Sequence, residues 1–124
     1  MAKHYRLGRE GEKIATEYLT NKNYTIRHTN WFYRHKELDI VAQENNTLVI
    51  AEVKTRKGDP DEIEMAQIAV NRQKQRFIIE ATNAYINEFD VDMEVRFDVI
   101  AIIFSHNTYY IKHIEDAFYP MVNE

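Results

Sequence analysis

Two short segments in the first half of the chain alternate ionisable with apolar residues, and their ionisable members are Glu37, Asp39, Glu52 and Lys54. Between the segments stands Asn45-Asn46, a pair that readily adopts the left-handed conformations of a tight hairpin turn. With a two-residue turn, opposed residues carry numbers that sum to 91, so Asp39 faces Glu52. By the same count Glu37 faces Lys54. Because alternate strand residues share a face, the pattern predicts all four side chains on one face of the hairpin.

The chemistry that such a hairpin end supports is metal binding by carboxylates. Opposed side chains lie only ~5 Å apart at Cβ, so Asp39 and Glu52 repel each other unless a cation lies between them. Oxygen ligands on rigid strands suit a hard divalent ion such as Mg²⁺ (or Mn²⁺), and Lys54 beside them could stabilise charge developing on a phosphate. The spacing agrees equally well with a structural interpretation, in which a Glu37–Lys54 ion pair stands beside a solvated Asp39–Glu52 end.

The surrounding segments predict an α/β fold. Apolar residues at helical spacing indicate helices over about residues 4–21 and 71–87. Aromatic and β-branched residues indicate strands over 24–33, 37–43, 47–55, 94–105 and 108–114, and an acidic loop opens at Lys57-Gly58-Asp59-Pro60. The order is α-β-β-β-α-β-β. The second helix should return the chain so that the fourth strand runs parallel to one of the first three.

Two glycines interrupt the first predicted helix. Gly8 and Gly11 lie on or beside its apolar stripe, and each costs ~1 kcal/mol of helix stability relative to alanine. Their presence indicates that the sheet or a ligand approaches the helix backbone closely.

The same segments carry the motifs of a known family. The chain contains Gly8-x-x-Gly11-Glu12-x-x-Ala15-x-x-Tyr18-Leu19, then Asn30-Trp31, Glu37-Leu38-Asp39-Ile40-Val41 and Glu52-Val53-Lys54-Thr55-Arg56. It thereby resembles the YraN-type group of uncharacterised bacterial proteins, which is similar to archaeal Holliday-junction resolvases and belongs to the PD-(D/E)XK nuclease superfamily. The resemblance covers about residues 7–100, because the pattern continues through Gly58-x-Pro60, Lys74-Gln75-Arg76 and Arg96-Phe97-Asp98-Val99. One departure is Lys36, where the family usually has glycine.

The resemblance implies a restriction-endonuclease-like αβββαβ core, with a central mixed sheet flanked by helices, as one nuclease-like domain over residues 1–124. It implies metal binding by Asp39 and Glu52, a charge-stabilising role for Lys54, and an accessory metal ligand at Glu12. Glu12 lies on one helical line with Gly8, Ala15 and Leu19, so its side chain can face the sheet.

The second predicted helix offers Lys74 or Gln75 as a further catalytic residue implied by the resemblance. Lys74 lies one turn before Phe77 and Ile78 and therefore points toward the sheet, which favours it over Gln75.

Positive charge is concentrated at the start of the chain. Residues 1–36 carry eight Lys/Arg against three Asp/Glu, whereas the remainder carries eight against seventeen, and the net charge is −4. A basic helix attracts polyanions, although an ordinary solvated helix face has the same pattern. The residues that we expect to contact a DNA backbone are Lys3, Arg6, Arg9, Lys13, Arg56 and Arg72.

The function that these features indicate is a Mg²⁺- or Mn²⁺-dependent endonuclease, a hydrolase of DNA phosphodiester bonds, with branched DNA as a candidate substrate. The alternative is a nucleic-acid-binding module on the same fold with little or no cleavage, and a weaker one is a scaffold that binds a protein partner. The resembling resolvases are dimers, so a homodimer is plausible.

Composition excludes several classes of protein. The absence of cysteine removes disulfide frameworks, thiolate zinc sites and cysteine nucleophiles, and it fits a reducing compartment. No run approaches the ~20 apolar residues of a membrane span, and the chain starts without a signal-peptide stretch. We therefore expect a cytoplasmic protein with no membrane partner.

Two further features have mainly structural interpretations. Trp31, Phe32 and Tyr33 beside Arg34 could stack on exposed bases, but a three-residue aromatic run on a strand must turn at least one face to the core, which favours packing. Asp98 lies among apolar strand residues, and we expect it to bond with a backbone group or near Arg96.

Overall fold

A computed structural model describes the backbone of residues 3–120 and the side chains of residues 7–120. Its elements are α1 (Lys3–Asn21), β1 (Thr25–Tyr33), β2 (Lys36–Glu44), β3 (Thr47–Lys57), α2 (Met65–Ile68), α3 (Arg72–Phe89), β4 (Glu94–Ser105) and β5 (Thr108–Phe118). The sequence predicted this order except for α2, whose four residues are too few to show a helical periodicity.

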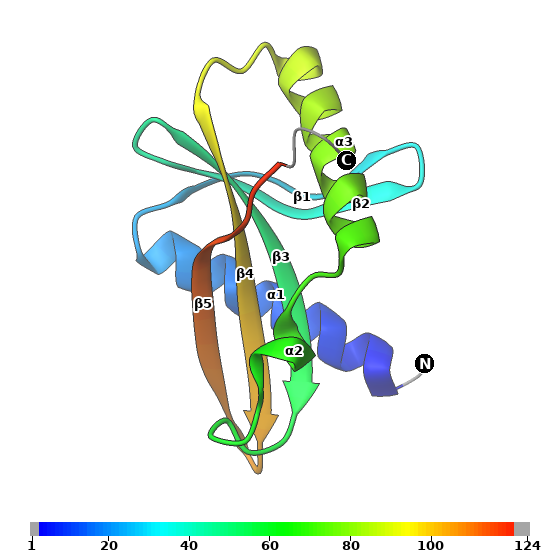
Figure 1. The fold of residues 1–124 in the computed structure, drawn as a ribbon. Helices are drawn as coiled ribbons and strands as arrows, with labels where there is room; N and C mark the ends of the chain where they lie inside the picture. The colour runs from blue at the N-terminus through cyan, green and yellow to red at the C-terminus, as the bar shows by residue number, and fades with distance from the viewer. Residues whose placement is uncertain (1–2, 121–124) are drawn as a thin grey trace.

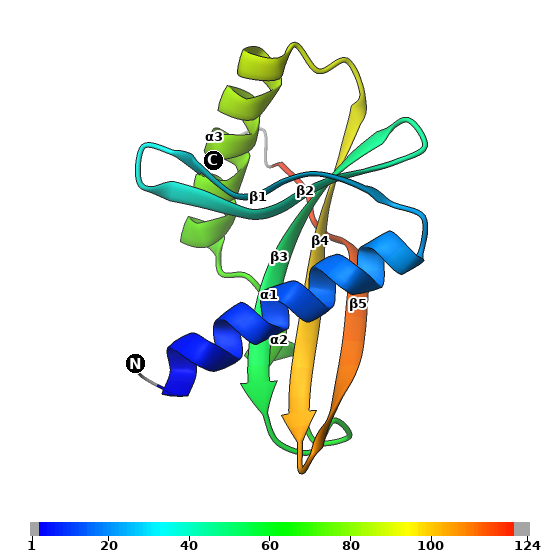
Figure 2. The same cartoon turned by 180° about the vertical axis from the view of Figure 1, so that it is seen from behind.

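The strands form one sheet in the order β1-β2-β3-β4-β5. All neighbours are antiparallel except β3 and β4, which run parallel because α3 returns the chain between them. The prediction of a parallel fourth strand is thus confirmed. Helix α1 crosses one face of the sheet, and α2 and α3 lie on the other (Figures 1 and 2). A mixed sheet flanked by helices in this order is the predicted αβββαβ core.

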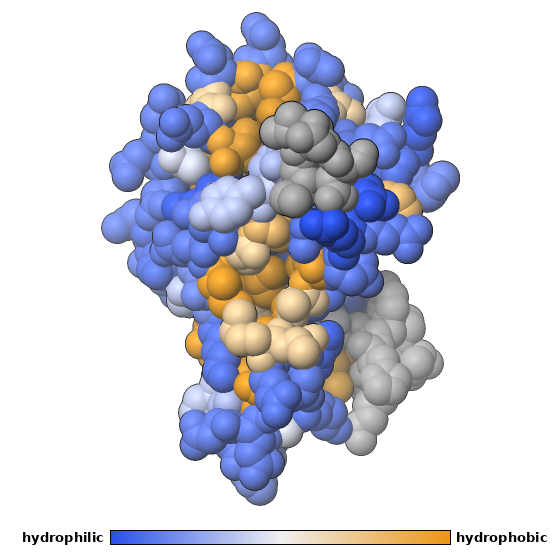
Figure 3. Space-filling view, in the orientation of Figure 1, coloured by the Kyte–Doolittle hydropathy of each residue, from blue (hydrophilic) through white to orange (hydrophobic). Residues whose placement is uncertain are grey.

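Each face of the sheet has its own core of buried residues. The α3-side core consists of Leu38, Val41, Leu48, Ile50, Val70, Ile78, Ala81, Tyr85, Phe97, Val99 and Phe118. The α1-side core consists of Ile14, Ala15, Leu19, Tyr24, Ile40, Ala42, Val49, Ala51, Ile100 and Ile102. Apolar side chains also reach the surface along the middle of the face that carries α2 and α3 (Figure 3).

The β2–β3 hairpin has the predicted turn and register. Asn45 adopts a left-handed φ of 54°, and the paired residues run from Glu44–Thr47 to Ile40–Ala51. Beyond that pair β2 leaves β3 and continues alongside β1, so that Glu37 pairs with Phe32. The two strands therefore part at the position of Asp39.

Helix α1 packs against β3 at only one of its two glycines. A Cβ on Gly11 would collide with Thr55 Oγ1, whereas a Cβ on Gly8 would have nothing within 4 Å. The close approach inferred from the glycines is therefore that of the sheet, at Gly11.

A buried polar network closes the α1 side of the sheet near β5. Asp98, which is 0% exposed, accepts hydrogen bonds from Arg96 at 2.8 and 2.9 Å and lies 2.8 Å from His113 Nε2. The backbone N–H of Asp116 donates to it at 3.2 Å. The structural interpretation of Asp98 is confirmed, since Arg96 and a backbone group are its partners.

Among the described residues, no helix is both long enough and apolar enough to cross a lipid bilayer.

Candidate metal centre

The carboxyl group of Asp39 lies in the gap where β2 and β3 separate. Its Oδ2 accepts a hydrogen bond of 2.9 Å from the backbone N–H of Val53. This N–H would bond to a backbone carbonyl of β2 if the two strands stayed paired. The alternation of β2 also breaks here, because Leu38 belongs to the α3-side core and Ile40 to the α1-side core. Asp39 can therefore contact groups from both faces of the sheet.

Three carboxylates converge at this gap from the α1 side. Glu12 on α1 and Glu37 and Asp39 on β2 each offer an oxygen atom, and these atoms all lie within 4.8 Å of one another. Asn30 holds two of them in place, since its Nδ2 donates to Glu12 Oε1 at 2.8 Å and to Glu37 Oε2 at 2.7 Å. This donor lies between like charges that otherwise repel.

Burial makes two of these acids, Asp39 and Glu12, hard to ionise. It raises the pKa of Asp39 to about 8, with the charge of Glu52 as the next cause, and a hydrogen bond joins the two side chains. Burial raises the pKa of Glu12 as well, although the Asn30 hydrogen bond opposes it. Without a cation, the structure favours a proton in the position between Asp39 and Glu52.

Glu52 reaches Asp39 from the α3 side. It is only 8% exposed, which contradicts the alternative of a solvated Asp39–Glu52 end. Burial raises its pKa, while the charges of Lys74 and Lys54 oppose that rise. Lys74 Nζ lies 3.9 Å from Glu52 Oε1. The two lysines therefore favour the ionised form of Glu52.

The prediction that the four hairpin side chains share one face is wrong. Glu52 lies with Lys74 of α3, whereas Glu37 lies with Glu12 of α1. The reason is the parting of the strands: the register argument holds up to Ile40–Ala51 and fails beyond it. Asp39 connects the two sides because it contacts both groups.

The expected opposition of Glu37 and Lys54 is wrong for the same reason. Glu37 pairs with Phe32 on β1, and its carboxylate accepts from Asn30. Lys54 remains on β3, where its charge acts on Glu52. The structural interpretation based on a Glu37–Lys54 ion pair thus loses its geometric basis.

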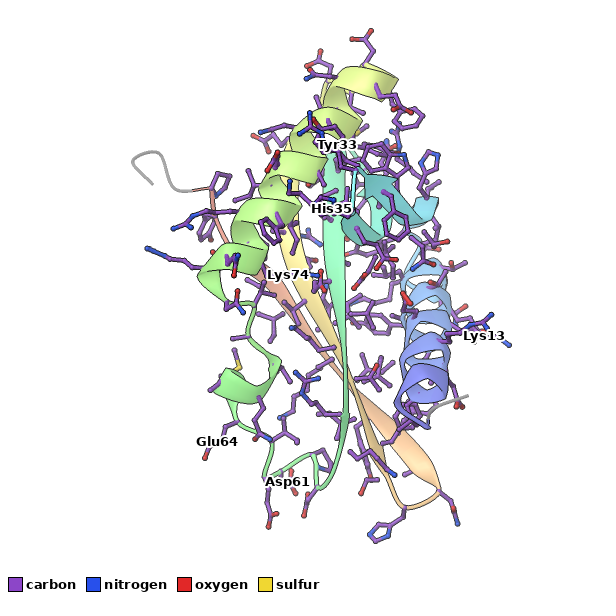
Figure 4. The ribbon with its side chains drawn as sticks, turned by 90° about the vertical axis from the view of Figure 1, so that its right-hand side faces the viewer. Lys13, Tyr33, His35, Asp61, Glu64 and Lys74 are labelled. Atoms are coloured by element: carbon purple, nitrogen blue, oxygen red, sulfur yellow. The ribbon has the colours of Figure 1, made fainter. Side chains whose placement is uncertain are left out.

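On α3 the structure distinguishes Lys74 from Gln75. Lys74 approaches Glu52, and Figure 4 shows it on α3, across β3 from the helix that carries Lys13. The Gln75 side chain instead donates to the carbonyl of Val70 at 2.8 Å, a contact local to the start of α3. Of the two, Lys74 is the residue that adjoins the carboxylates.

The predicted DNA-contacting side chains that the structure describes line separate hollows. Arg9 and Lys13 line a hollow of about 440 Å³, whose other walls are Glu12, Thr16, Glu17, Thr29, Asn30 and Asp39. The side chains of Lys3 and Arg6 lie outside the described residues. Arg56 donates to the carbonyls of Gln67 and Thr55, both at 2.8 Å, and Arg72 lines a separate hollow on α3.

The sequence did not identify Glu37 as a member of the carboxylate cluster, or Asn30 as the donor that bonds to Glu12 and Glu37. Glu37 was assigned to an ion pair, and Asn30 was recognised only as part of the Asn30-Trp31 motif. A signal for Asn30 existed, because asparagine is disfavoured in strands. In the structure its φ is 50°, a left-handed conformation inside β1 that asparagine tolerates better than most residues.

Comparison with known proteins identifies the family. The model of the uncharacterised protein family UPF0102 matches residues 11–102. A UPF0102 protein of Phocaeicola vulgatus is 47% identical, with 98% of this chain and 99% of the relative covered. One from Bacteroides fragilis is 48% identical (97% and 98% covered), and one from Flavobacterium psychrophilum is 42% identical (96% and 98%). The chain belongs to the UPF0102 family.

Proposed function

We propose that this protein is a divalent-ion-dependent endonuclease that hydrolyses DNA phosphodiester bonds. The observation that carries the proposal is the convergence of Glu12, Glu37 and Asp39 within 4.8 Å, at a gap in the sheet that two lysines also approach. The resemblance to PD-(D/E)XK nucleases points to the same chemistry.

The donor set fits Mg²⁺ or Mn²⁺. All of the donors are carboxylate oxygens, which hard divalent ions prefer. Glu12, Glu37 and Asp39 would hold the ion, and Glu52 would join them through its contact with Asp39. When bound, such an ion supplies Lewis acidity toward a phosphoryl oxygen and acidifies the attacking water.

The chain's own residues supply positive charge around this gap. Lys54 and Lys74 act on Glu52 from the α3 side, and either ammonium group could also approach a phosphate oxygen. Fixed charges aimed at a developing negative charge stabilise a transition state without reorganisation. On the α1 side, Arg9 and Lys13 line the hollow that contains Glu12 and Asp39, where they could bind the DNA backbone.

Asn30 would position the acids. Its amide holds Glu12 and Glu37 at fixed orientations. Removing a residue that hydrogen-bonds to metal ligands typically lowers metal affinity by about 10- to 100-fold.

The test is nicking of supercoiled plasmid in Mg²⁺, in Mn²⁺ and in excess chelator. The parent should nick only with a divalent ion, and Asp39→Asn should not nick. Asp61→Asn is the matched control, because Asp61 is exposed in the acidic loop at the far end of the sheet (Figure 4). Equal nicking by Asp39→Asn, or nicking in chelator, would contradict the proposal. Salt-dependent DNA binding without nicking in either ion would support the binding module instead.

A further inference from the structure

An exposed phenylalanine stands next to the candidate metal centre. The side chain of Phe32 is 57% exposed. Its partner across β1–β2 is Glu37, and opposed residues of antiparallel strands project to the same face with Cβ atoms about 5 Å apart. The side chain of Phe32 therefore projects from the same face as Glu37, one of the three carboxylates, on the α1 side of the sheet.

The neighbours of Phe32 are anchored on the opposite face. Trp31 and Tyr33 pack against the α3-side core, and Trp31 meets Tyr85 edge to face with ring centroids 5.1 Å apart. Strand alternation then turns Phe32 away from that core. Packing explains two members of the aromatic run and leaves the third unexplained.

The turn that follows β1 adds positive charge. Arg34 is exposed, with its guanidinium group 5.1 Å from the centre of the Tyr33 ring. His35 beside it is also exposed, and Figure 4 shows both Tyr33 and His35 on this hairpin. The charge of Arg34 is thus on the same hairpin as Phe32, against the neighbouring Tyr33 ring. Exposed aromatic rings combined with nearby basic side chains are what proteins use to hold single-stranded nucleic acid.

We propose that Phe32 stacks on an unpaired nucleobase and so directs the carboxylate site to DNA that contains single-stranded segments, an inference that rests on the proposed function. Bases inside a duplex are covered on both faces by their neighbours, so only an unpaired or splayed base presents a face to the ring. The opposed position of Glu37 puts the backbone of a stacked nucleotide near the carboxylates.

The affinity test compares a short oligo(dT) with a blunt duplex of equal length, by fluorescence anisotropy in chelator. Stacking predicts that Phe32→Ala weakens oligo(dT) binding by about 5- to 100-fold and duplex binding by less than about twofold. Phe32→Trp should retain or improve oligo(dT) affinity. Tyr109→Ala is the matched control, since Tyr109 is 46% exposed on the β4–β5 hairpin, and it should change neither affinity.

A spectroscopic measurement separates stacking from a structural role. The chain has one tryptophan, Trp31, so Phe32→Trp adds a single reporter. Titration with oligo(dT) should quench the added fluorescence relative to the parent, and the blunt duplex should quench it much less. Absence of quenching by oligo(dT) would overturn the proposal, as would equal loss of both affinities in Phe32→Ala.

The outcomes also distinguish this inference from the proposed function. If Phe32→Ala keeps the parent's preference between the two DNAs while Asp39→Asn still abolishes ion-dependent nicking, stacking is contradicted and the nuclease proposal stands. If the parent binds neither DNA, both are contradicted.

Discussion

The Asp39 carboxylate takes the place of a backbone acceptor, because its Oδ2 receives the Val53 N–H at 2.9 Å. This one bond ties a β2 side chain to the β3 backbone at the point where the strands part. It holds the acid in a partly buried gap, next to Glu52 and within reach of Glu12. Several properties of the protein should depend on that placement.

Stability without a divalent ion should fall as the pH rises. Burial raises the pKa of Asp39 to about 8, against roughly 3.9 in an unfolded chain. Because the folded protein holds the Asp39 proton more tightly than the unfolded chain does, this proton contributes its full stabilisation below the unfolded pKa. The contribution is lost as the pH rises through the folded pKa of about 8. Between pH 5 and 8, the free energy of unfolding of the parent in chelator should therefore decline more steeply than that of Asp39→Asn, by up to about 1.4 kcal/mol per pH unit.

Urea unfolding across this pH range measures the difference. Glu12 and Glu52 also have raised pKa values, so the Asp39→Asn profile should be shallower rather than flat. If the free energy of unfolding varied with pH in the same way for both proteins, the raised pKa of Asp39 would be refuted.

Substituting alanine for each of the two glycines of α1 should change the stability of the fold in opposite directions. Gly8→Ala meets no atom within 4 Å, so it should stabilise the fold by up to about 1 kcal/mol through helix propensity. Gly11→Ala collides with Thr55 Oγ1 and should destabilise by about 1–3 kcal/mol. Thermal unfolding of both variants checks this. Partial rescue of Gly11→Ala by Thr55→Ala is expected, and a Gly11→Ala protein as stable as Gly8→Ala would refute the contact.

The fold could be predicted from the sequence wherever local patterns determine it. Asn45-Asn46 specified the turn, and the resulting register was right as far as Ile40–Ala51. It failed at Asp39, because β2 leaves β3 there and continues alongside β1, in which Asn30 has a left-handed φ of 50°. Alternation and turn length, which are local rules, do not contain that tertiary information.

The same limit applied to the site. Asp39 and Glu52 were identified from the hairpin spacing and Glu12 from the family motifs, and the structure brings the three to one gap. The position of Glu37 in the carboxylate cluster was missed, because the predicted register placed Glu37 opposite Lys54.

The network around Asp98 should dominate the stability of the β4–β5 end. Asp98→Asn removes the buried negative charge that pairs with Arg96, and it should lower the free energy of unfolding by about 3 kcal/mol or more. Glu115→Gln is the control, since Glu115 lies 3.5 Å from Arg96 but is 53% exposed, and it should cost less than about 1 kcal/mol. Urea unfolding at neutral pH compares the two. Equal, small effects would show that the Asp98 contacts contribute little.

Acid should weaken the same network. Burial alone would raise the pKa of Asp98, but hydrogen bonds from His113 and Arg96 lower it. The stabilisation is therefore present above the unfolded value of about 3.9 and is lost as the pH falls through the lower folded pKa. Acid unfolding of Asp98→Asn should lack this contribution.

Lys54 should act on chemistry more than on ion binding. Lys54→Met keeps the aliphatic stem and removes the charge, so Mn²⁺ affinity should stay equal or rise while nicking falls by ~10²-fold or more. Lys57→Met, at the exposed end of β3, is the matched control and should nick like the parent. Calorimetry and the nicking assay give the two readouts. Unchanged nicking by Lys54→Met would remove Lys54 from the site.

The most direct measurement is a calorimetric titration of Mn²⁺ into the parent, Asp39→Asn and Asp61→Asn, repeated in two buffers of different ionisation enthalpy at neutral pH. The parent and Asp61→Asn should bind Mn²⁺ and release protons, because an ion replaces the proton that the raised pKa of Asp39 retains. Asp39→Asn should bind far more weakly and without that release. A parent that binds no Mn²⁺, or an Asp39→Asn variant that binds it equally well, would contradict a metal centre at the parting of β2 and β3.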